Sequence, residues 1–199
     1  MAASKLALCN MALARLGNPQ TLQQTDLDNN TNNAALICNA LYNDVLRTVI
    51  SEHMWSCCLT RVTISANGTA PNHGYAYRYA VPSDCLQVLE MNSSSAYNDF
   101  VVESGWILSN DSVCKILYLF ENTTVTTWNI FLERAFLAKF VAELCMGTTG
   151  DLRRYSGYLQ AYQFELQNCI TMDSMQGSHQ IISSSTLSDV RDGLDLLGV

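Results

Sequence analysis

The sequence predicts an α+β protein: an N-terminal and a C-terminal helix pair form an antiparallel helical bundle, a small antiparallel β-sheet is inserted between the pairs, and an extended C-terminal tail follows. Apolar residues recur with a helical period over residues 1–55 and again over 125–176, whereas residues 56–124 alternate with the two-residue period of strands. Residues 177–199 are rich in Ser and Thr and predict the tail. We therefore expect a discontinuous four-helix bundle, an inserted β region and a C-terminal docking segment with these boundaries.

The first helix is predicted over residues 4–16, because one face carries four apolar residues in helical spacing. A glycine and a proline follow and end it. Residues 20–30 are rich in Asn, Gln and Asp and predict a loop. The second helix is predicted over about 33–52, with Thr31 or Asn32 as its N-cap. The apolar faces are formed by Leu6, Cys9, Leu13 and Leu16 in the first helix, and by Ala34, Cys38, Leu41, Tyr42, Val45 and Val49 in the second.

Six strands are predicted in the inserted region. Three tyrosines and Val81 share one face of the second strand, and Pro82 ends it because proline has no backbone N–H to donate. Ser104-Gly105 predicts a short hairpin turn. The last strand is apolar on both faces apart from Lys115, which predicts a central place in the sheet. The predicted strands span residues 57–67, 75–81, 85–91, 100–103, 106–109 and 113–120.

Two further helices are predicted after residue 127. Residues 131–146 are apolar nearly all round, which is typical of a helix with neighbours on several sides. Two glycines interrupt the pattern at 147 and 150, and Asp151 is expected to cap a fourth helix that extends to about Met172. The short connection predicts an antiparallel pair. The inner face of the fourth helix is predicted to carry Leu152, Tyr155, Leu159, Tyr162, Leu166 and Cys169.

The C-terminal tail carries four apolar residues in helical spacing. These residues are Leu187, Val190, Leu194 and Leu197. We expect them to form a docking segment that becomes ordered in the groove of a partner. The alternative is a terminal segment that packs on its own domain.

Composition argues against several classes of function. The net charge is −7, and the eleven Lys and Arg residues are scattered along the chain with only Arg153 and Arg154 adjacent, so a free-standing nucleic-acid binder is not expected. The sequence has no signal-peptide pattern and no apolar run of roughly 18 residues, so we expect no membrane partner. The eight cysteines form no CxxC pair and the three histidines lie far apart, which predicts reduced, buried thiols rather than a metal site. We expect no catalytic residues and no cofactor.

Residues 53–91 are predicted to be the junction at which the chain leaves the bundle and enters the sheet. Trp55 is expected to anchor the end of the second helix against the sheet. Tyr77 lies in the strand with alternating tyrosines, and Pro82 begins the corner after it. We therefore interpret these three residues as a structural junction rather than as an active site.

Several short motifs occur in a recognisable order along the chain. They are Leu8-Cys9-Asn10 with Ala12-Leu13 and Leu16-Gly17, Cys38 and Tyr42, His53-Met54-Trp55, Arg61, the run Gly74-Tyr-x-Tyr-x-Tyr79-x-Val-Pro82, and Asp84-Cys85-Leu86. In this order and spacing the chain resembles the tail tubular protein A family, the head-to-tail adaptors of short-tailed bacteriophages, over roughly residues 4–175. The adjacent Cys57 and Cys58 depart from the pattern of that family.

The resemblance implies a structural virion protein rather than an enzyme. Such adaptors form a ring, usually twelvefold, that joins the portal protein to the tail nozzle (tail tubular protein B), and tail fibres often dock at its side. DNA passes through the lumen during ejection, and an acidic lumen would let it pass without specific binding. The protein would be made in the host cytoplasm and located in the virion, and its tail would dock on the portal. The family has no active site, so no catalytic, cofactor or metal residue follows from the resemblance.

Two other functions are also compatible with the sequence. A cytosolic α+β enzyme or ligand-binding protein could share this plan, because a fold does not fix a function. A deep pocket with converging ionisable groups would favour that alternative. Another phage connector, such as a head-completion protein, is the second alternative and would differ in its position in the particle.

Overall fold

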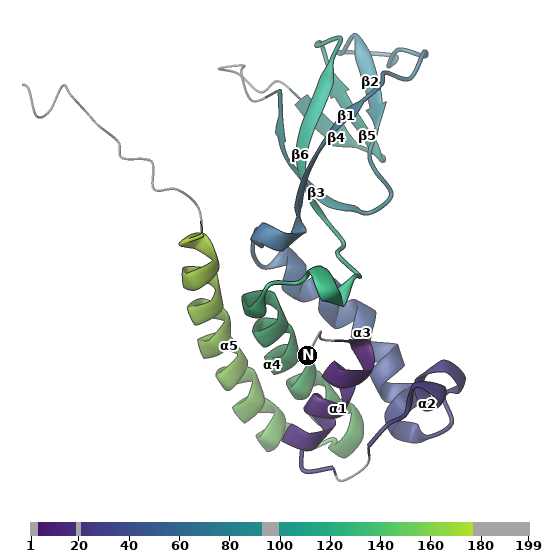
Figure 1. The fold of residues 1–199 in the computed structure, drawn as a ribbon. Helices are drawn as coiled ribbons and strands as arrows, with labels where there is room; N and C mark the ends of the chain where they lie inside the picture. Colours follow the sequence, from purple (N-terminus) through teal and green to yellow (C-terminus); the bar gives the residue numbers. More distant parts are fainter. Residues whose placement is uncertain (1–3, 19–20, 93–99, 177–199) are drawn as a thin grey trace, which may run out of the picture.

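The computed structural model describes residues 4–18, 21–92 and 100–176. Within these ranges the chain forms five α-helices and two small antiparallel sheets, so the predicted α+β class is confirmed (Figure 1). The tail residues Leu187, Val190, Leu194 and Leu197 lie outside the described residues. The helices are α1 (Lys5–Arg15), α2 (Gln24–Asn29), α3 (Asn33–Ser51), α4 (Ile130–Thr149) and α5 (Leu152–Ser174), and two 3₁₀ turns are η1 (Ser56–Cys58) and η2 (Val125–Thr127).

Side-chain caps fix where the long helices begin. The Asn32 side chain accepts a hydrogen bond from the backbone N–H of Ala35 (2.9 Å) and caps α3. Asp151 accepts from the first turn of α5, as its place in the sequence predicts. Gly150 ends α4 at a φ of 64°, a left-handed conformation that glycine adopts without steric cost.

The prediction of a loop over residues 20–30 is wrong, because α2 lies within this range. Only one residue of this short helix, Leu27, is buried, so the sequence shows no apolar period. The helix is held instead by polar contacts: the side chain of Asp26 accepts from the backbone N–H of Gln23 (2.7 Å), and the Asn39 amide of α3 donates to the carbonyl of Leu27 (2.6 Å). Tertiary contact therefore decided this element.

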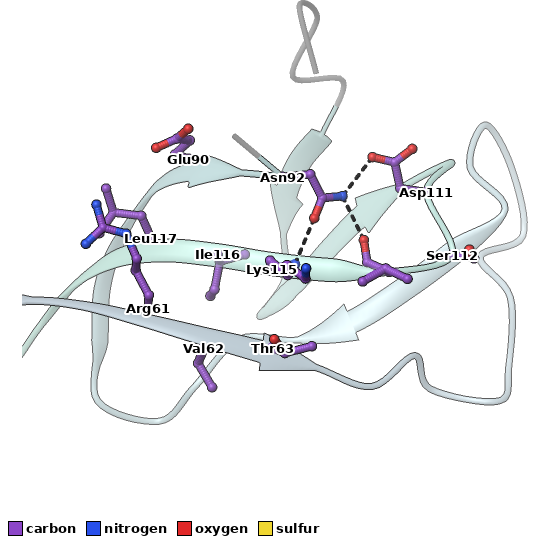
Figure 2. Close-up of a pocket in the computed structure, with 11 residues that line it drawn as sticks. Arg61, Val62, Thr63, Glu90, Asn92, Asp111, Ser112, Lys115, Ile116 and Leu117 are labelled. Carbon is purple, nitrogen blue, oxygen red and sulfur yellow. Dashed lines mark hydrogen bonds between the residues drawn. The ribbon is translucent and has the colours of Figure 1, made fainter. Parts of the chain in front are cut away.

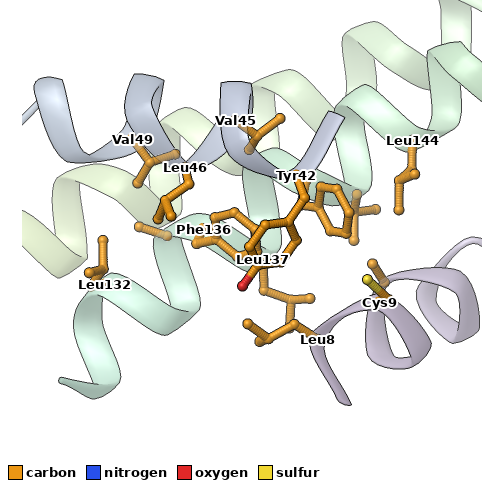
Figure 3. Close-up of a cluster of buried hydrophobic side chains, with 14 of the residues drawn as sticks. Leu8, Cys9, Tyr42, Val45, Leu46, Val49, Leu132, Phe136, Leu137 and Leu144 are labelled. Carbon is orange, nitrogen blue, oxygen red and sulfur yellow. The ribbon is translucent and has the colours of Figure 1, made fainter. Parts of the chain in front are cut away.

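Helix α4 lies in the middle of the helical part and packs against α1, α3 and α5. This position explains why α4 is apolar on nearly all sides. The centre of the core is aromatic: the ring centroid of Phe136 lies 5.0 Å from that of Tyr42 (Figure 3). It lies 5.2 Å from that of Phe140. Leu8 and Cys9 of α1 close the same core and are fully buried. Burial of this apolar surface is the main stabilising contribution to the helical part.

The strands form two three-stranded sheets, which corrects the prediction of a single small sheet. One sheet has the order β1-β6-β3 and the other the order β2-β5-β4. Strand β6 is central, as its apolar sequence predicts, and β5 is central in the second sheet. The strands are β1 (Leu59–Ile64), β2 (Tyr77–Ala80), β3 (Cys85–Met91), β4 (Phe100–Glu103), β5 (Trp106–Ser109) and β6 (Cys114–Phe120).

Both sheets contribute to a second hydrophobic core. Tyr79 of β2 and Ile107 of β5 are fully buried there, together with Cys114 and Ile116 of β6. Leu119 of β6 belongs instead to the helical core, so β6 contributes to both cores. The helices and the strands occupy opposite ends of the molecule (Figure 1). None of the helices in the described ranges is long and apolar enough to span a membrane.

Candidate functional site

The chain passes between the helical part and the strands at two places, and Trp55 lies at the first. It follows the end of α3, is fully buried and belongs to the helical core. Its indole N–H donates to the carbonyl of Val49 (2.8 Å), a group near the end of α3. The ring of His53 meets the Trp55 ring edge to face, with 4.9 Å between centroids. Trp55 is thus held to the last turns of α3.

Asp173 of α5 is the main polar centre of this junction. Its side chain is 2% exposed, and its carboxylate accepts hydrogen bonds from the backbone N–H of Ser56 (3.0 Å) and the hydroxyl of Ser56 (2.8 Å). The amide of Asn129, which caps α4, donates to the same carboxylate (2.6 Å). Nε2 of His53 lies 3.3 Å from Oδ2 of Asp173. One buried carboxylate therefore joins the end of α3, the turn η1, the start of α4 and the end of α5.

Asn122 has a similar role where the chain returns from β6. It is 2% exposed, and its amide donates to the carbonyl of Cys57 (2.9 Å), which lies in the outgoing segment. Its side-chain oxygen accepts from the hydroxyl of Thr127 (3.0 Å), and its backbone carbonyl accepts from the indole of Trp128 (2.9 Å). The two segments that connect helices and strands are thus hydrogen-bonded to each other.

Ser56, His53 and Asp173 are the residue types of a hydrolytic triad, but their order in space is different. In such a triad the histidine accepts the proton of the serine, and the aspartate orients the histidine. Here Asp173 lies between the other two, and the Ser56 hydroxyl donates to Asp173. This geometry does not activate Ser56 as a nucleophile. It instead satisfies a buried charge with several donors, which is the arrangement expected of a structural centre.

Asp173 and Asn122 are the residues that sequence reasoning missed. A carboxylate in the last turn of a helix is usually solvated, so Asp173 was not expected to be buried. A signal was present, because position 173 continues the buried spacing of Tyr162, Leu166 and Cys169. Asn122 follows the central strand β6 and gives no comparable signal in the sequence.

A second link joins α5 to the end of α3. The hydroxyl of Tyr162 donates to the carboxylate of Glu52, the C-cap residue of α3. Burial raises the pKa of the Tyr162 hydroxyl, and the adjacent Glu52 charge raises it further. Tyr162 is therefore a neutral donor under physiological conditions.

An open groove of about 1030 Å³ lies along the β1-β6-β3 sheet (Figure 2). Asn92 organises its rim: its amide donates to Asp111 (2.8 Å) and to the carbonyl of Val113 (2.7 Å), and its oxygen accepts from the backbone of Lys115 (2.9 Å). The charged residues of the lining are Arg61, Glu90, Asp111 and Lys115. Their signs are mixed, so the groove presents no field of one sign to a charged ligand.

The cysteines are free thiols, six of them buried. Cys57 and Cys58 lie in the turn η1, and their Sγ atoms are 3.9 Å apart. Because this turn occupies both positions, the strand predicted from residue 57 begins only at Leu59. The Cys58 thiol lowers the pKa of Cys57 through a hydrogen bond, and the same contact together with burial raises the pKa of Cys58. Among the described residues, no group of three or more His, Cys, Asp or Glu side chains could hold a metal ion.

The three predicted junction residues lie in different surroundings. Trp55 is in the helical core, whereas Tyr77 begins β2 and packs against the second core. Pro82 lies between β2 and β3, and its carbonyl accepts from the backbone N–H of Cys85 (3.0 Å). The structure therefore does not bring Tyr77 into the hydrophobic cluster of Trp55.

No protein-family model matches this chain, and a search of curated proteins finds no match to it.

Proposed function

We propose that this chain is a structural subunit of the adaptor ring that joins the portal of a short-tailed bacteriophage to its tail nozzle. The observation that carries the proposal is the hydrogen-bonded junction around Asp173 and Asn122. A ring subunit must hold its contact faces at a fixed angle, and a junction tied at both crossings gives it that rigidity. The ordered motifs from Leu8 to Leu86 supply the resemblance to a particular family.

In this proposal the helices of residues 1–55 and 125–176 form a discontinuous four-helix bundle, and residues 56–124 form the β region. Copies of the chain assemble into a ring, twelvefold as in the resembling family, and DNA passes through its acidic lumen. The tail of residues 177–199 docks on the portal, while the tail nozzle and fibres meet other faces. The protein is then part of the virion.

The experiment that tests the proposal measures assembly on a purified portal ring by native mass spectrometry. We expect the full chain to add a ring of subunits to the portal. Deletion of residues 178–199 should leave a folded protein, judged by circular dichroism, that binds the portal poorly. As a control for chain length, a full-length variant with Leu187, Val190, Leu194 and Leu197 all changed to Ser should show the same loss. Unchanged portal binding by both variants would contradict the docking role of the tail.

The second candidate is a ligand-binding protein, and the groove in Figure 2 is the observation that favours it. Both cationic and anionic side chains line the groove, which suits a small zwitterionic or polar ligand. A screen of such compounds by thermal shift tests this candidate, with Lys115→Ala as the control variant. A compound that stabilises the wild-type chain but not this variant would favour ligand binding over the adaptor. A head-completion protein would be recognised by its different position in images of the particle.

A further inference from the structure

Beyond its first turn, the outward face of α5 carries no charge. Every exposed position from Ser156 to Met175, a stretch that the structure describes in full, is an uncharged residue. The two charged side chains of this stretch turn inward: Glu165 pairs with Arg134 of α4 (2.6 Å), and Asp173 is buried in the junction. A solvated helix face normally carries charges, so this face differs from an ordinary surface.

Three large apolar side chains on this face are exposed to solvent. Phe164 is 73% exposed, Met175 is 60% exposed and Met172 is 52% exposed. Phe and Met are enriched in protein interfaces, and the centres of interfaces are depleted of charge. The face of α5 therefore has the composition of a contact surface.

The charges at the ends of the helical part indicate what covers the face. Arg153 and Arg154 are exposed in the first turn of α5, and Arg154 donates to the carbonyl of Leu16 at the end of α1 (3.2 Å). Helix α2 lies on the opposite side of the helical part from α5 and carries Asp26 and Asp28 (Figure 1). A basic corner on one side and an acidic helix on the other are complementary between two copies of the same chain.

The net charge favours the same partner. Two copies with a net charge of −7 repel each other over most of their surfaces. The electrostatic repulsion between two copies is smallest where one of the two contacting faces is uncharged. Next to α2, helix α3 offers Leu36, which is 52% exposed, as an apolar counterpart.

We propose that the uncharged face of α5 is a subunit interface that receives the α2–α3 face of a second copy of this chain, with Arg153 opposite Asp28. The two faces are different surfaces, so the contact is head-to-tail, and repeating it generates a ring if the rotation closes. The inference rests on the proposed ring function and assigns the surface through which the ring forms.

Paired variants test the interface. Phe164→Glu should reduce ring assembly on the portal at least tenfold, because it places a charge at the centre of the contact. Val102→Glu is the matched control, since Val102 is 47% exposed on β4 and the change adds the same charge. Arg153→Glu and Asp28→Arg should each weaken assembly, and the double variant should restore it. A Phe164→Glu chain that assembles like the Val102→Glu chain, or a double variant without rescue, would overturn the interface.

A photo-crosslinking phenylalanine analogue at position 164 separates this inference from the proposed function. At high protein concentration without the portal, cross-links into residues 24–51 of another copy support the interface. Cross-links confined to residues 177–199 of the same copy, or the absence of links between copies, overturn it. A wild-type chain that fails to assemble on the portal would instead overturn the adaptor function, and the cross-link would still decide whether α5 contacts a second copy.

Discussion

Replacing Asp173 by Asn tests the junction directly. The variant keeps the size of the side chain but exchanges one carboxylate oxygen for an NH₂ group. In the wild type, one oxygen accepts from the Ser56 backbone and faces His53, while the other accepts from the Ser56 hydroxyl and the Asn129 amide. The single carbonyl oxygen of Asn can accept from only one of these two groups of donors. Its NH₂ group would then face the donors of the other group.

The expected loss follows from these contacts. A hydrogen bond to a charged group contributes about 1.5–3 kcal/mol, and an unpaired buried donor costs about 1–3 kcal/mol. With one bond lost and one donor left unpaired, we expect Asp173→Asn to lower the free energy of unfolding by about 3 kcal/mol. For a chain of this length that corresponds to a fall in Tm of roughly 6–12 °C.

Urea unfolding followed by circular dichroism measures this loss, as a lower midpoint with an unchanged slope. The control is Ser174→Ala at the next position, where the hydroxyl is exposed and donates only to the carbonyl of Ile170 within its own helix. This control should change the free energy of unfolding by no more than about 0.5 kcal/mol. A loss below about 1 kcal/mol for Asp173→Asn would show that the carboxylate does not hold the junction together.

Two further predictions concern titratable groups. The Thr31 hydroxyl and the Gln23 backbone N–H hold the pKa of Asp26 below its ordinary value of 3.8, so ionised Asp26 stabilises the folded chain above that value. The difference in urea midpoint between wild type and Asp26→Asn should therefore be present at neutral pH and disappear as the pH falls through the lowered folded-state pKa; a difference that persists in strong acid would contradict this. Cys57 should be the first thiol alkylated by iodoacetamide in the folded chain, because it is partly exposed and its pKa is lowered by Cys58, whereas burial raises the pKa of the other partly exposed thiol, Cys85. Peptide mapping by mass spectrometry measures both rates, and faster modification of Cys85 would refute the assignment.

Local periodicity predicted the elements in which one face is buried along its whole length. The strand with alternating tyrosines has its predicted face inward, because Tyr77, Tyr79 and Val81 are partly or fully buried and Ala80 is exposed. The central place of β6 also agrees with its sequence, since a strand that is covered on both faces of its sheet is apolar on both faces, and β6 contributes to both cores. These features depend on residues close together in the chain, so the sequence contains the information directly.

The tertiary structure alone decided the features that depend on distant residues. Helix α2 has one buried side chain, and a hydrogen bond from Asn39 of α3 adds to its local cap between Asp26 and Gln23. The division of the strands into two sheets depends on which partners β5 and β6 find, and a strand pattern does not specify its partner. Asp173 and Ser56 are 117 positions apart, and burial of this carboxylate is tolerated because two distant segments, at Ser56 and at Asn129, supply donors at one point. The sequence alone determined which faces are apolar, whereas the pairing of those faces and the polar groups between them required the assembled fold, because each such contact joins residues with no local pattern in common.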